Sequence, residues 1–180
     1  MSFMKTKYSI LLGLLAICFT ACTMDSSTNS TPQMSILTSH VNKTDTLNIY
    51  YTDQGGVLRL DTINVGDTIV FRLYLNGVTN NLTNFNLIQS DSTVAKLIYP
   101  VESSTATIIS NSQSNFANGT FVFLPKQVQV YFPVRYVAKK PTTSATVQFS
   151  LSSDANFNSL NGSNTFSMTL KTPIKAKLTQ

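Results

Sequence analysis

Apolar and polar residues alternate with a period of two along most of the chain. The clearest example is residues 68–76, TIVFRLYLN, where every second position is apolar: Ile69, Phe71, Leu73 and Leu75. Successive side chains of a β-strand point to opposite faces of the sheet, so this stretch predicts a strand that buries these four residues. No stretch of useful length has the period of an amphipathic helix. The chain is therefore predicted to be all-β.

Shorter alternating segments extend the pattern on both sides of this strand. They lie at residues 47–51, 57–60, 85–88, 94–99, 105–109, 121–123, 128–136, 147–151 and 166–170. Pairs such as Gly55-Gly56 and Asn76-Gly77 are typical of the turns between strands. Pro133 has no N–H to donate, so its strand is predicted to lie at a sheet edge there or to carry a bulge. Many short strands with regular turns predict an antiparallel β-sandwich, with a closed barrel as the alternative.

The N-terminus follows a different pattern. Lys5 and Lys7 precede an apolar run, Tyr8–Ala21, which is followed by Cys22. A positive start and a short apolar run that ends in small residues are typical of a secretory signal peptide, and a transmembrane helix would need ~20 apolar residues. Phe19-Thr20-Ala21-Cys22 resembles the bacterial lipoprotein box, in which the cysteine is lipidated and becomes the mature N-terminus. The alternatives are a signal peptide cut elsewhere and an uncleaved anchor.

The lipoprotein interpretation divides the chain into three parts. Residues 1–21 are the signal peptide, residues 22–34 are a flexible polar tether, and residues 35–180 are a single β domain. Acyl chains on Cys22 would hold this domain on a lipid membrane, since each buried CH₂ contributes ~0.8 kcal/mol. The expected location is the cell envelope, as an outer-membrane lipoprotein, with the periplasmic and surface-facing sides both left open.

Charge and cysteine content exclude several classes of function. The net charge is +5, and loss of Lys5 and Lys7 with the signal peptide lowers it to +3. Because the remaining basic residues are scattered, no nucleic-acid partner is expected. Cys18 and Cys22 are the only cysteines, so a mature chain that starts at Cys22 has no disulfide, zinc–thiolate site or cysteine nucleophile.

The residues that most enzymes use for catalysis are scarce. One histidine, His40, and one glutamate, Glu102, are too few for a histidine-based triad, a zinc site or a glycosidase acid with a well-placed partner. Two aspartates could in principle do glycosidase work. Asp45, Asp61, Asp67 and Asp91 each stand beside Thr or Ser at a turn or strand start, where a carboxylate bonds local backbone. Residues 61–67 have Ile63 where an EF-hand loop needs a calcium ligand. No enzymatic activity, metal or cofactor is expected.

Three of these aspartates begin an Asp-Thr-aliphatic pattern. The segments are Asp45-Thr46-Leu47, Asp61-Thr62-Ile63 and Asp67-Thr68-Ile69. They are similar to the acceptor motif for general O-glycosylation of exported proteins in Bacteroidota, which makes Thr46, Thr62 and Thr68 candidate glycosylation sites. The alternative is that Asp-Thr-Ile is ordinary chemistry at the start of a strand.

A binding surface is predicted from the outward positions of two strands. If the alternation holds, Arg72 and Tyr74 face solvent, as do Tyr131 and Arg135 if the register continues across Pro133. Tyrosine and arginine are enriched at interfaces, so adjacent strands would place these four residues in one binding patch. The alternative is that they are ordinary solvent-facing residues of a sheet.

The leader, the polar tether and the segment Val65–Leu73, VGDTIVFRL, together resemble the small single-domain lipoproteins of Bacteroidota. This resemblance implies an immunoglobulin-like sandwich of about seven to nine strands and a family of unknown function. The chain has no tryptophan, so an antibody-type domain is not expected. The predicted function is a membrane-anchored, non-catalytic interaction module, either adhesin-like or an accessory subunit, whose partner is an envelope protein or a glycan. The alternatives are a structural envelope lipoprotein without a ligand and a glycan-binding module.

Overall fold

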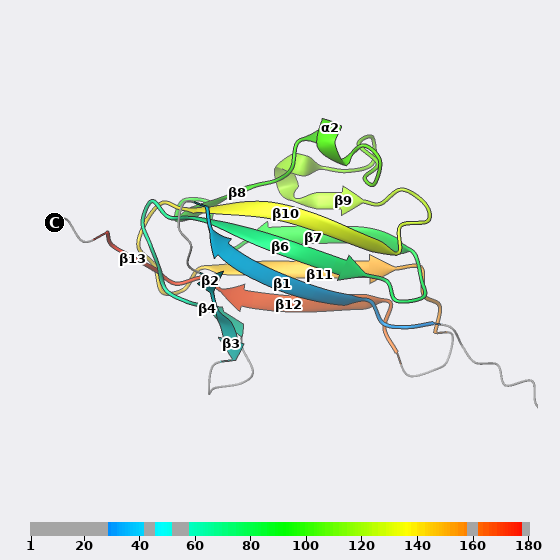
Figure 1. Ribbon diagram of the computed structural model, residues 1–180, viewed down its shortest axis with the longest axis horizontal. Helices are drawn as coiled ribbons and strands as arrows, with labels where there is room; N and C mark the ends of the chain where they lie inside the picture. Colours follow the sequence, from blue (N-terminus) through cyan, green and yellow to red (C-terminus); the bar gives the residue numbers. More distant parts are fainter. Residues whose placement is uncertain (1–28, 42–45, 52–57, 158–161, 178–180) are drawn as a thin grey trace, which may run out of the picture.

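The computed structural model describes residues 29–41, 46–51, 58–157 and 162–177. About half of these residues lie in strands of two sheets that stack face to face (Figure 1). The five-stranded sheet has the order β2 (Thr46–Leu47), β1 (Gln33–His40), β6 (Thr68–Asn76), β10 (Gln129–Ala138) and β8 (Ala95–Ile98). The described part of the chain is therefore mostly β, as predicted, with one short helix.

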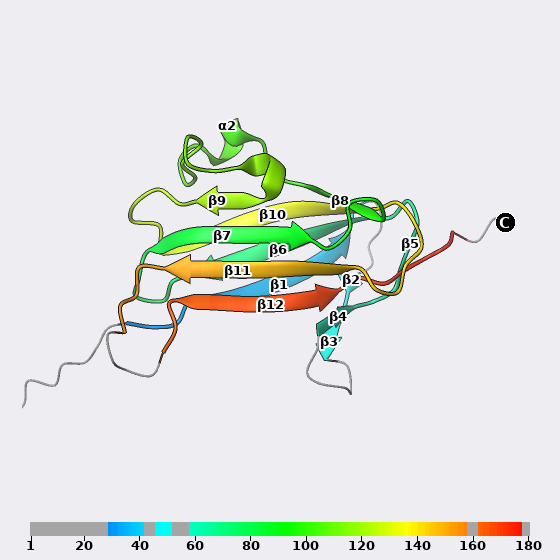
Figure 2. The ribbon, with the colours of Figure 1, turned by 180° about the vertical axis from the view of Figure 1, so that it is seen from behind.

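The six-stranded sheet lies behind the first and is seen from its own side in Figure 2. Its order is β3 (Ile49–Tyr51), β4 (Leu58–Leu60), β12 (Thr165–Lys171), β11 (Thr146–Ser153), β7 (Leu82–Gln89) and β9 (Thr120–Val122). Neighbouring strands are antiparallel in both sheets, except that β12 and β4 run parallel. A small parallel pair, β5 (Ile63–Asn64) with β13 (Ile174–Lys175), completes the strands of the described part. The strands therefore form separate sheets with free edges rather than one closed sheet.

The core between the sheets follows the predicted alternation. All four predicted core residues of β6 are fully buried: Ile69, Phe71, Leu73 and Leu75. Aromatic rings join the two layers, because the Phe71 centroid lies 6.2 Å from that of Phe149 on β11. The Phe85 centroid on β7 lies 5.7 Å from that of Phe132 on β10. Each sheet therefore buries one face against the other.

Two segments near the N-terminus differ from the prediction. β1 was not predicted as a strand, and it begins at Gln33, inside the range assigned to the tether. Its Ile36 and Leu37 are adjacent apolar residues, which hides the alternation, and Leu37 is 69% exposed. The single strand predicted at 47–51 is wrong, because Leu47 pairs with Thr38 in one sheet and Ile49 pairs with Leu60 in the other.

The crossing between sheets occurs at Asn48, and Asp61 fixes it. The Asn48 N–H donates to Asp61 Oδ2 at 2.8 Å, and the Asp61 N–H donates to the Asn48 carbonyl at 3.0 Å. This pair of bonds holds the chain where it passes from β2 to β3. The carboxylate of Asp61 thus bonds backbone that is thirteen residues away rather than the local backbone that was predicted.

The strand suggested at residues 105–109 is also wrong. Thr105 ends the short helix α2 (Glu102–Thr105), residues 106–108 form a turn, and Ile109 makes only an isolated bridge to Phe123. A 3₁₀ turn, η1 (Phe116–Asn118), lies in the loop that follows. Hydroxyl groups favour the helical turn, since Ser104 Oγ donates to the Val101 carbonyl at 2.7 Å.

Pro133 lies at a sheet edge, which is one of the two arrangements predicted for it. β8 pairs only with residues 135–138 of β10, and the register of β10 to β6 runs unbroken through Pro133.

Candidate functional site

The leader lies outside the described residues. The lipidation prediction at Cys22 and the signal peptide at residues 1–21 therefore stay predictions. Among the residues that the structure does describe, no helix is both long and apolar enough to cross a membrane.

The candidate glycosylation threonines have different surroundings. Thr62 is exposed between β4 and β5, and Thr68 is half-buried at the start of β6, opposite Val137. Thr46 belongs to β2, but its side chain lies outside the described part. Thr62 is therefore the one of the two described side chains that is open to a modifying enzyme.

The four residues of the predicted binding patch lie on one surface. β6 and β10 are adjacent and antiparallel, and Tyr74 stands directly opposite Tyr131. The two ring centroids are 4.9 Å apart with the rings tilted by 39°, a favourable aromatic pair. Tyr131 is 77% exposed, because its strand points it away from the core. The register across Pro133 therefore holds as predicted.

The arginines extend this pair along the same outer face. Arg72 is opposite Pro133, and Arg135 is opposite both Val70 on β6 and Ile98 on β8. Arg72 and Arg135 are thus diagonal neighbours, a relation that places Cβ atoms ~7–8 Å apart. Both are exposed. We define the Tyr/Arg face as nine neighbouring outward residues of this sheet: Leu37, Val70, Arg72, Tyr74, Lys96, Ile98, Tyr131, Pro133 and Arg135. Other outward positions of the sheet, such as Ser35 and Ser39 of β1, are small and polar.

A hollow of about 440 Å³ opens at the β8 side of the Tyr/Arg face. It is lined by Val70, Ile98, Tyr99, Pro100, Val101, Pro133 and Arg135. Its walls are apolar apart from the Tyr99 hydroxyl and the Arg135 guanidinium. Burial raises the pKa of Tyr99 to about 12, and its hydroxyl donates to the Leu87 carbonyl at 2.8 Å. Tyr99 is therefore a neutral wall of the hollow rather than a reactive group.

The outer face of the six-stranded sheet has a different chemistry. Its long strands present mainly small polar side chains: Asn84, Asn86, Gln148, Ser150, Ser152, Thr165, Ser167 and Thr169. Several hydroxyls bond each other, as Ser167 Oγ does with Ser150 Oγ at 3.2 Å. Ile88 and Lys171 are the exceptions on these three strands. Tyr50 and Arg59 lie beside Lys171 at the β3–β4 end of this face, so its small polar surface is confined to β7, β11 and β12.

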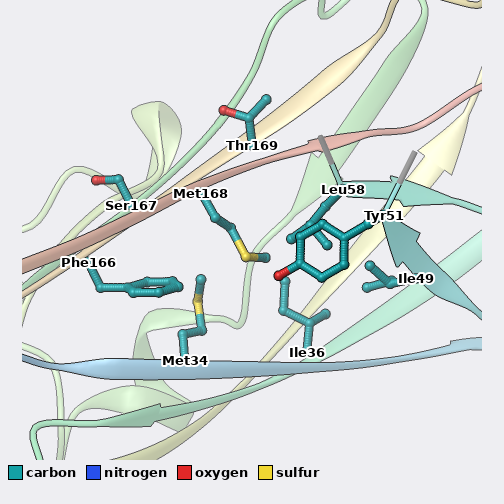
Figure 3. A pocket seen from close by; sticks show the side chains of 9 residues that line it. All are labelled: Met34, Ile36, Ile49, Tyr51, Leu58, Phe166, Ser167, Met168 and Thr169. Carbon is teal, nitrogen blue, oxygen red and sulfur yellow. The ribbon is translucent and has the colours of Figure 1, made fainter. Parts of the chain in front are cut away.

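An apolar groove of about 580 Å³ lies between β1 and β12, at the edge where the two sheets are open (Figure 3). Met34 and Ile36 of β1 face Phe166 and Met168 of β12 across it, and Leu58 closes one end. The remaining lining residues are Ile49, Tyr51, Ser167 and Thr169. None of the nine lining side chains carries a formal charge.

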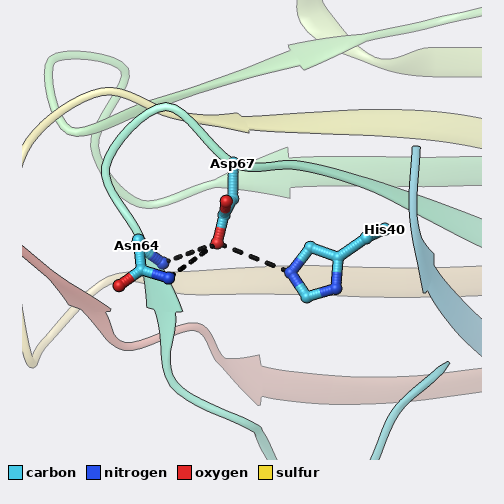
Figure 4. Close-up of polar contacts among 3 residues, drawn as sticks. All are labelled: His40, Asn64 and Asp67. Atoms are coloured by element: carbon cyan, nitrogen blue, oxygen red, sulfur yellow. Dashed lines mark hydrogen bonds and ion pairs between the residues drawn. The ribbon is translucent and has the colours of Figure 1, made fainter. Parts of the chain in front are cut away.

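His40 contacts one of the predicted turn aspartates (Figure 4). Asp67 Oδ2 accepts the Asn64 N–H at 2.9 Å, which closes the turn before β6, where Gly66 has φ +89°. The same oxygen lies 3.5 Å from His40 Nε2, close enough for an ion pair when the imidazole is protonated. His40 makes no hydrogen bond within the described residues. This contact joins the end of β1 to the start of β6.

The other sequence predictions on acidic residues have mixed outcomes. Asp91 Oδ1 accepts the Thr93 N–H at 2.7 Å, as predicted for a local turn, and hydrogen bonds from Thr93 lower the pKa of this exposed carboxyl. Asp45 lies outside the described residues. No group of three or more His, Cys, Asp or Glu residues that could hold a metal ion occurs in residues 29–41, 46–51, 58–157 and 162–177.

Three apolar residues around the arginines of the Tyr/Arg face were not predicted from the sequence. Leu37, Ile98 and Val101 add apolar area around the arginines and are 69%, 41% and 67% exposed. The alternation in β8, AKLI, could have placed Ile98 outward, opposite to the buried Leu97. Leu37 and Val101 carry no such signal, because neither lies in a segment that was predicted as a strand.

Comparisons with known proteins give no family for this chain. No family model matches it, and no curated protein matches. A solved structure of a DUF4466 family protein from Parabacteroides merdae, a member of the Bacteroidota, is similar at 16% sequence identity and a TM-score of 0.34. The similarity covers 79% of this chain and 44% of that one. The chain therefore spans less than half the length of the protein that it resembles.

Proposed function

We propose that the chain is an envelope lipoprotein, anchored through acylated Cys22, whose β domain is a non-catalytic interaction module. The observation that carries the interaction role is the contrast between the two outer faces. One face presents a Tyr pair, two arginines and an apolar hollow on its central strands, whereas β7, β11 and β12 of the other present mainly small polar groups. Tyr and Arg are the residue types that dominate binding energy at interfaces. The domain is either adhesin-like or an accessory subunit of an envelope complex.

The proposal includes an immunoglobulin-like description of the fold, which the strand order supports. If β1, β6, β7, β8, β10, β11 and β12 are named A to G in chain order, the five-stranded sheet contains the order A-B-E-D. The six-stranded sheet contains the order G-F-C. The two sheets of a seven-stranded immunoglobulin-like sandwich have the same strand orders, which supports this part of the proposal. β9 is then an additional strand beside C, reached by the loop that holds α2 and η1.

The anchor and the modification are tested together by mass spectrometry. Protein extracted from membranes of its native host is expected to start at Cys22 and to carry acyl mass on that residue. Exposure also favours Thr62 as a glycosylated threonine, which would add sugar mass to its peptide. C22S should lose the acyl mass and T62A the sugar mass. A protein whose mass equals that of bare residues 22–180 would contradict both parts.

The interaction role is tested by site-specific photocrosslinking. A benzophenone amino acid replaces Tyr131 on the Tyr/Arg face and, as the matched control, Gln148 on the opposite outer face. Both positions are exposed on central strands. In intact envelopes of the native host, position 131 is expected to yield a discrete crosslinked product and position 148 none. Equal labelling from both positions, or none from either, would support a structural lipoprotein without a ligand.

A further inference from the structure

Positive charge gathers on the Tyr/Arg face. Arg72, Lys96 and Arg135 point outward from three neighbouring strands, and none of the residues that define this face is an Asp or Glu. In the part of the chain that the structure describes, the single ion pair is that between His40 and Asp67. Two diagonal guanidiniums without a counter-charge repel each other weakly in water and attract an anionic partner.

The apolar part of the face indicates which class of anionic partner fits. The hollow beside Arg135 is walled by Ile98, Val101 and Pro133, and Leu37 lies next to Arg72 on the other side. Sugar hydroxyls placed against such aliphatic walls would lose hydrogen bonds to water without replacement. An aliphatic or aromatic side chain of a protein instead gains from burial there. The face therefore suits a protein better than an acidic polysaccharide.

We propose that the partner of the Tyr/Arg face is an acidic protein segment that presents a large apolar side chain next to carboxylates. This inference rests on the proposed interaction role and names its chemistry. The apolar side chain enters the hollow, and a neighbouring carboxylate pairs with Arg135 at the rim. A second carboxylate reaches Arg72, and the exposed ring of Tyr131 packs against the segment between them.

The experiment uses a displayed library of random twelve-residue peptides and the purified domain with its tether, in which C22S keeps the protein soluble. Peptides selected on this protein are expected to be enriched in Asp and Glu close to Leu, Ile, Phe or Met. Their affinity should fall about tenfold for each arginine lost, because charge-assisted hydrogen bonds contribute that much. R72E/R135E should therefore abolish measurable binding of the selected peptides. R72Q/R135Q should weaken binding to a smaller extent, because glutamine does not repel the carboxylates of the peptide. Binding should also weaken as salt rises.

The matched control is K171E/K175E, which makes the same change in net charge at two exposed lysines away from the face. This variant should bind the selected peptides within about twofold of wild type. Circular dichroism verifies that all variants keep the β fold.

Several outcomes would overturn the inference. Selected peptides without acidic enrichment, or equal binding by wild type and R72E/R135E, would show that charge does not select the partner. Arginine-dependent binding of polygalacturonate, or of vesicles with phosphatidylglycerol, in the absence of peptide binding would identify another class of partner. In each of these cases, a crosslink from position 131 would leave the proposed interaction role intact.

Discussion

The two faces of the five-stranded sheet are built from the same strands but have opposite roles. On β6, Phe71 is fully buried, whereas its neighbour Arg72 is exposed. On β10, Tyr136 is buried and Tyr131 is 77% exposed. The inner side chains pack against the second sheet, and the outer ones have no layer over them within the described residues. The inner side chains of these strands therefore stabilise the fold, and the outer side chains form the candidate binding surface.

The largest effect is expected from the inner aromatic residues. Phe71→Ala removes a ring that packs against Phe149 and Tyr136, with centroids 6.2 and 5.8 Å away. Because truncation of a buried phenylalanine leaves a cavity, the free energy of unfolding is expected to fall by ~3–5 kcal/mol. Chemical denaturation followed by circular dichroism measures it. A loss below ~1 kcal/mol would show that the core between the sheets is not closely packed.

A smaller effect is expected from a single buried hydroxyl. The Tyr136 hydroxyl and Thr172 Oγ1 are 2.8 Å apart, and both residues are buried. Burial raises the pKa of Tyr136 and the bond to Thr172 opposes that rise. Tyr136→Phe leaves Thr172 without this partner, so the unfolding free energy should fall by ~1–2 kcal/mol. The same denaturation measurement is made on Tyr136→Phe and Thr172→Val, and equal stability of all three proteins would contradict the bond.

The outer face provides the matched controls, with the smallest expected effects. Arg72→Ala and Tyr131→Phe should change the unfolding free energy by less than ~0.5 kcal/mol, because exposed side chains away from special features rarely contribute more. The same variants lie on the proposed binding surface. A stability loss as large as that of the inner variants would mean that the outer face is structural, which would remove the main support for the interaction role.

Much of the fold could be predicted from the sequence where alternation is strict. The residues of β6, β11 and β12 were found with their faces, since period-two patterning is a local property of one strand. The same rule failed at β1, where Ile36 and Leu37 are both apolar, and at residues 47–51, where one apolar pattern is divided between two sheets. It also failed at α2, where hydroxyl bonds to the backbone override a short β-like pattern.

The sequence by itself determined which side chains of β6 and β10 point outward, and therefore that Arg72, Tyr74, Tyr131 and Arg135 are surface candidates. It could not determine that the two strands are neighbours, because pairing between residues about sixty positions apart depends on the packing of the whole sheet. Only the tertiary structure placed Tyr131 opposite Tyr74, brought Ile98 beside Arg135 and formed the hollow from three separate segments. Local alternation sets the direction of a side chain, whereas long-range strand order sets its neighbours, and a binding surface requires both.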